Sequence, residues 1–148
     1  MPVSVARIVL ILLLALGLTA QASAETPDVA LDRLLAEARG EAAATGTCAR
    51  DDIDRLVRIF CTGTIRAGVR EKYPLFGTRI GTERFGYDVD GARAIAEFLN
   101  VDAELVRVKA STRISLLDED KIDIVLATMG HNTQRDGQVG FIRPHYYQ

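Results

Sequence analysis

The chain has 148 residues, of which 48% are hydrophobic and 26% are charged. This balance is typical of a globular protein with an apolar core and excludes a long disordered chain. The 18 basic and 20 acidic residues give a formal net charge of −2, so the sequence lacks the basic footprint of a nucleic-acid-binding protein.

The first 24 residues are organised like a secretory signal peptide. Arg7 precedes an apolar run from Ile8 to Leu18, and residues 22–24, Ala-Ser-Ala, form a small-x-small cleavage site. A membrane anchor is the alternative, but the run is shorter than the roughly 20 apolar residues that a spanning helix needs. We therefore expect cleavage after Ala24, a soluble mature chain from Glu25 in the periplasm, and no membrane insertion after cleavage.

Residues 25–63 predict a helical extension with a linker. Helical spacing of apolar residues follows Pro27 and continues to Arg39, and Gly40 is a stop signal. The small and polar residues 40–50 predict the linker. Asp51 or Asp52 then caps a second helix, which ends at Thr62-Gly63. The apolar stripe of the first helix consists of Val29, Leu31, Leu34, Leu35 and Ala38.

The two cysteines, Cys48 and Cys61, lie in the part of the chain that we expect to be exported, where disulfides persist. We expect a disulfide between them, which would stabilise the fold by roughly 3 kcal/mol on the chain-entropy model. Two buried thiols are the alternative. No metal site is expected, because His131 and His145 are remote from the cysteines in sequence.

From Thr64 onward the expected elements follow the order strand, helix, strand, helix, strand. Crossover connections of this length predict a parallel sheet with helices on its faces. A loop and one short extra strand, Arg84–Tyr87, precede the first of these helices. The predicted ranges of the five main elements are Thr64–Val69, Asp88–Leu99, Ala103–Val108, Ser111–Asp118 and Ile122–Ala127.

The segment from Ile122 to Arg135, IDIVLATMGHNTQR, leads from an apolar strand into a polar loop that ends in an arginine. Open α/β sheets bind ligands beyond the carboxyl ends of their strands. The guanidinium of Arg135 is a planar donor fork that suits a carboxylate, and Thr128 adds a hydroxyl. The alternative is that Arg135 begins a solvated helix.

With these segments in place, the chain resembles the bacterial extracellular solute-binding proteins of family 3, which deliver amino acids to ABC importers. The segment GYDVDGARAIAEFL, Gly86–Leu99, resembles the signature of that family. GVREKYPLFG, RISLL, KIDIVLATM, NTQR and FIRPHYY follow in the family's order, so the resemblance spans about Thr64 to Tyr147. Gly91 replaces a large apolar residue of the family pattern, and we expect a packing gap there.

The resemblance implies an α/β fold like the first lobe of a type II periplasmic-binding protein. This lobe would be a mainly parallel sheet with helices on both faces, incomplete, formed by residues 64–148. By similarity, Arg135 would hold the α-carboxylate of the ligand. Thr128 and Gly130 would contact the carboxylate and the ammonium, with Gly130 limited to its N–H because a serine or threonine is commoner there. Tyr73 and Phe76 match the aromatic positions of the first loop, and Tyr73 is the better ligand candidate because Phe76 equally fits core packing.

Two further arginines suggest which amino acid binds. Arg70 and Arg113 match positions that binders of acidic amino acids, by resemblance, direct at the ligand. Several cations around one cleft repel each other unless an anion offsets them, so we expect a ligand such as glutamate or aspartate. The alternative is that Arg70 or Arg113 pairs at the surface with Glu71, Asp118 or Glu119.

The resulting hypothesis is a monomeric periplasmic protein that binds an acidic amino acid and passes it to the permease subunits of an ABC importer. It has no catalytic residues, cofactor or metal. The alternatives are the ligand-sensing domain of a signalling receptor and a dehydratase-like enzyme on the same fold. Family members usually continue beyond the point that matches Gln148 into a second lobe, so we expect weak or undetectable ligand binding by these residues alone.

Overall fold

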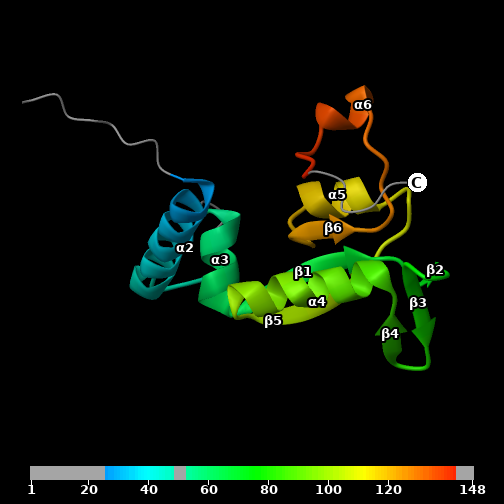
Figure 1. The fold of residues 1–148 in the computed structure, drawn as a ribbon, viewed down its shortest axis with the longest axis horizontal. Coiled ribbons are helices and arrows are strands. Elements are labelled where there is room, and N and C mark those ends of the chain that lie inside the picture. The colour runs from blue at the N-terminus through cyan, green and yellow to red at the C-terminus, as the bar shows by residue number, and fades with distance from the viewer. Residues whose placement is uncertain (1–25, 49–52, 143–148) are drawn as a thin grey trace, which may run out of the picture. The chain divides into compact units, whose positions relative to one another are not determined.

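A computed structural model describes residues 26–48 and 53–142, and Figure 1 shows its helices and strands. The expected signal peptide and its cleavage site lie outside the described residues, as do Asp51, Asp52 and His145. Within the described ranges, no helix has the length and apolar character needed to cross a membrane.

The central sheet has three parallel strands in the order β5-β1-β6. They are β1 (Thr64–Val69), β5 (Asp102–Arg107) and β6 (Ile124–Leu126). Strand β1 pairs with both neighbours, with Ile65 opposite Ala103 and Ala67 opposite Ile124. The crossovers contain helices α4 (Tyr87–Leu99) and α5 (Arg113–Asp118). The predicted parallel α/β arrangement of strand, helix, strand, helix, strand is therefore confirmed.

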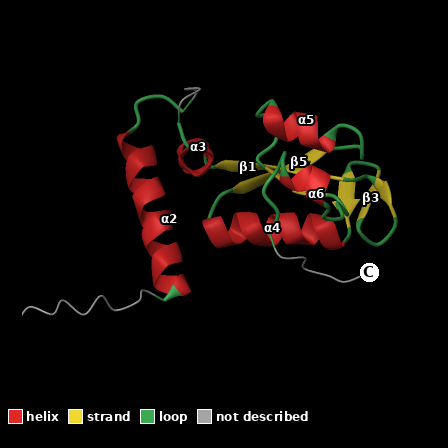
Figure 2. Ribbon diagram, turned by 90° about the horizontal axis from the view of Figure 1, so that it is seen from above, coloured by secondary structure: helices red, strands yellow, loops and turns green. Residues whose placement is uncertain are grey.

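Each face of the sheet is covered by one of these helices, and Figure 2 shows α4 and α5 on opposite sides. Side chains alternate along a strand, so successive residues enter different cores. Ala67, Val69 and Leu126 pack with Val89 and Ala92 of α4. The residues of the other core are Val108, Ile122 and Ala127, with Val106, Leu116, Leu117 and Val125 around them. Because both faces of the sheet are packed with apolar side chains, the strand ends are rigid and hold the loops that follow them in place.

A second, antiparallel sheet follows β1, where the sequence predicted a loop and one short strand. Its strands are β2 (Lys72–Tyr73), β3 (Gly77–Ile80) and β4 (Glu83–Phe85), in the order β2-β3-β4. Gly81 makes the turn between β3 and β4 with φ +61°, a conformation that glycine adopts without steric penalty. Strands this short leave little periodicity to detect, which explains the incomplete prediction.

Helix α4 has the predicted range within one residue, but its start and its packing differ from the prediction. The N-cap is Gly86 with φ +123°, whereas Asp88, the first residue of the predicted range, is buried inside the helix. Asn100 is the C-cap. The gap expected at Gly91 is absent, because a Cβ atom added there would lie 3.1 Å from Leu126 Cδ2. The neighbouring leucine therefore fills that space.

The predicted linker is partly helical. Helix α2 (Pro27–Ala44) continues past Gly40, because the following Glu-Ala-Ala-Ala are strong helix formers. Of its predicted stripe, Leu35 and Ala38 are buried, but Val29, Leu31 and Leu34 are exposed.

Helix α3 (Arg55–Thr62) is the second predicted helix, and a disulfide holds its last turn. Its N-cap is Asp54, and not Asp51 or Asp52 as expected. The side chain of Asp54 accepts a hydrogen bond from Leu56 N. It ends at Gly63 in the left-handed conformation, as the sequence indicates. Cys48 and Cys61 form the disulfide, with 5.5 Å between their Cα atoms.

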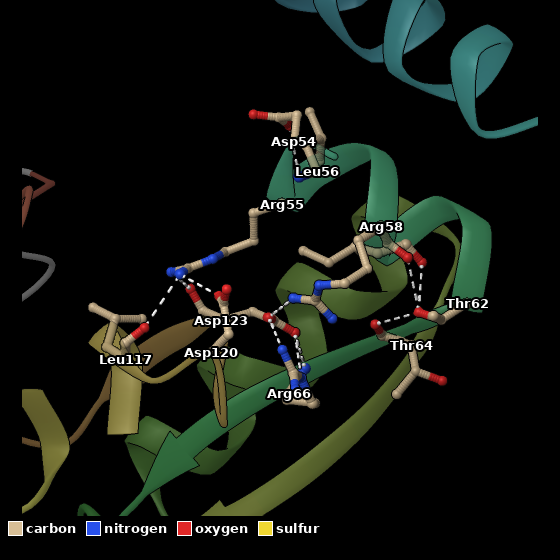
Figure 3. Close-up of polar contacts among 11 residues, drawn as sticks. Asp54, Arg55, Leu56, Arg58, Thr62, Thr64, Arg66, Leu117, Asp120 and Asp123 are labelled. Carbon is tan, nitrogen blue, oxygen red and sulfur yellow. Dashed lines mark hydrogen bonds and ion pairs between the residues drawn. The ribbon is translucent and has the colours of Figure 1, made fainter. Parts of the chain in front are cut away.

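A buried carboxylate connects α3 to the central sheet (Figure 3). The side chain of Asp123, just before β6, is fully buried and forms ion pairs with Arg58 of α3 and with Arg66 of β1. It also accepts a hydrogen bond from the backbone N of Arg66 at 2.8 Å. Burial by itself would raise the pKa of Asp123, but the hydrogen bonds from both arginines outweigh it and hold that pKa below its ordinary value.

Candidate ligand-binding site

The carboxyl ends of β1 and β6 bring two predicted site residues together. Arg70 follows β1, and its Nη1 lies 3.4 Å from Oγ1 of Thr128, two residues beyond β6. Thr128 has φ +50°, which is uncommon for a residue with a β-branched side chain. Its hydroxyl donates to the carbonyl of Ala127 at 2.8 Å. Strained backbone of this kind is concentrated at functional sites, and here it lies at the edge where α/β sheets bind ligands.

Arg70 also lies against the aromatic residues of the first loop. Its Cζ lies 4.5 Å from the ring centroid of Tyr73, a cation–π distance. The ring of Phe76 packs edge-on between Tyr73 and Tyr87, with centroid distances of 5.6 Å and 6.4 Å. Tyr73 is exposed and Phe76 is partly buried, so Tyr73 is the more accessible of the two predicted aromatic contacts.

Arg113, the second predicted arginine of the side-chain site, supports the end of β6. It is buried, and its Nη1 donates to the carbonyl oxygen of Ala127 at 2.7 Å. Arg113 therefore does not lie at the surface, as the alternative of a surface ion pair required. Direct contact between Arg113 and a ligand stays a prediction. Its hydrogen bond holds the residue before Thr128 and so helps to set the geometry of the loop.

Arg135 is the third residue of α6 (Thr133–Asp136), a short helix capped by Asn132. Its Nη1 donates to the carbonyl oxygen of Gly130 at 2.5 Å. Arg135 therefore contacts Gly130, and Arg70 lies beside Thr128. Gly130 and Thr128 both belong to the loop after β6. Arg135 is partly buried, but α6 contains no buried residue, so the alternative of a solvated helix start and the proposed carboxylate contact both stay open.

Glu71, considered above as one possible surface partner of Arg70 or Arg113, is buried instead. Its carboxylate is buried and accepts from Arg84 Nε at 2.9 Å, while Arg107 and Arg79 lie at 3.6 Å and 3.8 Å. The register of the antiparallel sheet explains why Glu71 is needed as a counterion, because Arg79 and Arg84 are directly opposite each other on β3 and β4. Like charges in that position need a counterion.

A pocket of about 250 Å³ lies at the carboxyl ends of β1 and β5. Its lining residues are Arg70, Glu71, Lys72, Arg107, Val108, Lys109 and Ala110. Across the described part of the chain, no group of three or more histidine, cysteine or acidic residues could hold a metal ion. The site therefore offers cations, hydroxyls and backbone groups, which are suited to bind an anion.

Together, the doubly covered parallel sheet and the cations at its carboxyl edge define the ligand-binding lobe of a type II periplasmic-binding protein. The chain belongs to the bacterial extracellular solute-binding proteins, family 3, because the sequence profile of that family matches residues 65–148, more than half of the chain. Among curated protein sequences, none matches this chain.

Solved structures share this fold. The arginine-bound form of domain 1 from TmArgBP is 28% identical, with a TM-score of 0.58, and the match covers 64% of this chain and 73% of that domain. The cysteine-binding protein from Campylobacter jejuni is 33% identical with a TM-score of 0.59, covering 62% and 39%. An ancestral cyclohexadienyl dehydratase is 30% identical with a TM-score of 0.60, covering 66% and 41%. The chain thus spans about two fifths of the latter two proteins.

Proposed function

We propose that this protein binds an amino acid with an acidic side chain outside the cytoplasm and supplies it to the permease subunits of an ABC importer. The observation that carries the proposal is the position of Arg70, which lies against Thr128 and over the ring of Tyr73. Membership of the solute-binding family supports a small-molecule ligand. The arginine-bound and cysteine-binding structures support an amino acid as that ligand.

The head of the amino acid would bind at the loop after β6. One guanidinium nitrogen of Arg135, Nη1, donates to the carbonyl of Gly130, which leaves the other guanidinium donors for an α-carboxylate. The backbone N–H of Gly130 and the hydroxyl of Thr128 are on the same loop. Charge-assisted hydrogen bonds to a carboxylate are roughly twice as strong as neutral ones, so this group would provide most of the affinity for the head.

The side chain of the ligand would meet Arg70. Two unit charges 4 Å apart interact by about 4 kcal/mol at an effective dielectric constant of 20, so an acidic side chain is attracted and a cationic one repelled. Arg113 would contribute indirectly, through its hydrogen bond to Ala127. An acidic ligand therefore fits this chain better than arginine, although arginine is the ligand in the structure of domain 1 from TmArgBP.

A dehydratase is the second candidate function, because an ancestral cyclohexadienyl dehydratase has the same fold at 30% identity. We favour binding without catalysis. His131, a possible proton-transfer group, is exposed and paired with Asp136 at 2.7 Å, and it packs on Phe141. Release of product from prephenate-type substrates would favour the enzyme. A sensing role shares the same binding step and would be favoured by a kinase or cyclase gene beside this one.

The test is a titration of the 148-residue chain with glutamate, aspartate, glutamine and arginine, followed by amide chemical shifts. We expect weak binding, with the two acids strongest. Arg135→Gln should abolish binding of all four ligands, whereas Arg70→Gln should remove only the preference for glutamate over glutamine. Arg93→Gln is the matched control, because Arg93 is an exposed residue of α4 paired with Asp90. Tighter binding of arginine than of glutamate would refute the acidic specificity.

The proposed location has its own test. N-terminal sequencing of exported protein should begin at Glu25. A chain that retains Met1 or Pro2 would contradict cleavage of a signal peptide.

A further inference from the structure

The strand order β5-β1-β6 divides the carboxyl edge of the central sheet into two sides. Arg70, after the middle strand, has the Thr128 loop on its β6 side and the 250 Å³ pocket on its β5 side. Neighbouring strands lie about 4.8 Å apart, so the ends of β5 and β6 are separated by about 10 Å. One elongated ligand can therefore reach both sides.

The pocket on the β5 side is strongly cationic. Its lining contains four basic residues, Arg70, Lys72, Arg107 and Lys109, and one carboxylate, Glu71. That carboxylate pairs with Arg79 and Arg84 from outside the lining and also, at 3.6 Å, with Arg107 of the lining. Among the described residues, no ion pair engages either lysine. Because the whole chain has a net charge of −2, this is a local concentration of positive charge that an anion would relieve.

The backbone around the pocket is fixed in place. Val108 N donates to Val69 O at 2.9 Å, which holds the end of β5 against β1. Lys109 N donates to Oγ1 of Thr112 at 3.2 Å, and its carbonyl accepts from Thr112 N at 3.1 Å. Lysine ammonium groups on a fixed backbone act as point charges, and they suit a phosphate group.

We propose that this pocket binds a doubly charged oxyanion at the end of the ligand's side chain, so that the preferred ligand is a phosphate-bearing amino acid and not one with a single carboxylate. The inference rests on the proposed function, which places the head of the amino acid on the β6 side. Lys72 and Lys109 are then the residues that distinguish a phosphate from a carboxylate, while Arg70 contacts either.

The test compares O-phospho-L-serine, L-glutamate and inorganic phosphate as ligands of the 148-residue chain in phosphate-free buffer, with amide chemical shifts as the readout. O-phosphoserine should bind at least fivefold more tightly than glutamate. The double variant Lys72→Met with Lys109→Met should bind O-phosphoserine at least tenfold more weakly and glutamate within twofold of the wild type. Lys121→Met, at an exposed position outside the pocket lining, should change neither affinity.

The outcomes separate this inference from the proposed function. If glutamate binds and O-phosphoserine binds no better, the inference is overturned and the proposed function stands. If the double variant retains the preference for O-phosphoserine, the pocket is not its source and the inference is also overturned. If no amino acid binds detectably, but inorganic phosphate shifts the amide signals of residues 107–110 in the wild type and not in the double variant, the oxyanion pocket is supported. The proposed function then also stands, because undetectable amino-acid binding by these residues alone is compatible with it.

Discussion

Replacing Asp123 by asparagine should destabilise the fold strongly, because this residue joins three elements. Its fully buried carboxylate pairs with Arg58 of α3 and with Arg66 of β1, and it lies just before β6 (Figure 3). Asparagine preserves the shape and can still accept the hydrogen bond from the backbone N of Arg66. It removes the negative charge and leaves two arginines, whose side chains are 18% and 24% exposed, without their shared partner.

The expected decrease in the free energy of unfolding follows from the burial of the Asp123 carboxylate. Removing one partner of a buried ion pair costs about 3–5 kcal/mol. Because both arginines retain some contact with water, we expect the lower end, about 3 kcal/mol, and a fall in Tm of about 10–15 °C for a domain of this size. Asp120→Asn is the control. That carboxylate pairs with Arg55 at 2.6 Å but is 65% exposed, so its removal should cost less than about 1 kcal/mol.

Urea unfolding at pH 7, followed by circular dichroism, measures the decrease in free energy of unfolding for both variants. Repeating the measurement at low pH tests whether these decreases are electrostatic in origin. Since the folded-state pKa of Asp123 is below its ordinary value of 3.8, the stabilisation is complete above that value and is lost as the pH falls through the folded-state pKa. The difference in free energy of unfolding between the wild type and Asp123→Asn should therefore become smaller below pH 3.8. A loss at pH 7 no larger than that of the control would refute the reasoning.

Two further substitutions test the supports of the fold and the site. Cys48→Ser with Cys61→Ser should lower the free energy of unfolding by roughly 3 kcal/mol without changing relative ligand affinities, and an unchanged urea midpoint would contradict a stabilising disulfide. Arg113→Met should cost about 1.5–3 kcal/mol through loss of the charged hydrogen bond to Ala127, and it should weaken glutamate and glutamine binding equally. Weakening of glutamate alone would indicate instead that Arg113 contacts the acidic side chain.

The parallel core was predictable from sequence because its signal is redundant. Ile65, Ala67 and Val69 alternate along β1, and all three are buried. The stripe of α4 repeats at helical spacing, and its members Val89 and Ala92 contact the same sheet. A pattern that extends over six or more residues specifies both the type of element and the face that it buries.

The ion-pair connections were not predictable, because they join residues far apart in sequence. Asp123 is 57 residues from Arg66 and 65 from Arg58, and nothing in the local pattern links them. The burial of Glu71 was likewise not evident from the sequence. Its burial depends on how β3 and β4 fold back, which two short strands do not reveal. Long-range ion pairs are therefore the part of this structure that the local sequence pattern does not predict.

The loop that carries Arg70 and Tyr73 is held by close backbone contacts as well as by charge. A Cβ atom added to Gly77 would lie 2.2 Å from the carbonyl oxygen of Arg70, and one added to Gly86 would lie 2.5 Å from the carbonyl oxygen of Phe76. Only glycine fits either approach. The loop is thus ordered before any ligand arrives, and a preorganised site loses less conformational entropy on binding. The same contacts keep Arg70 beside Thr128 and in the lining of the cationic pocket.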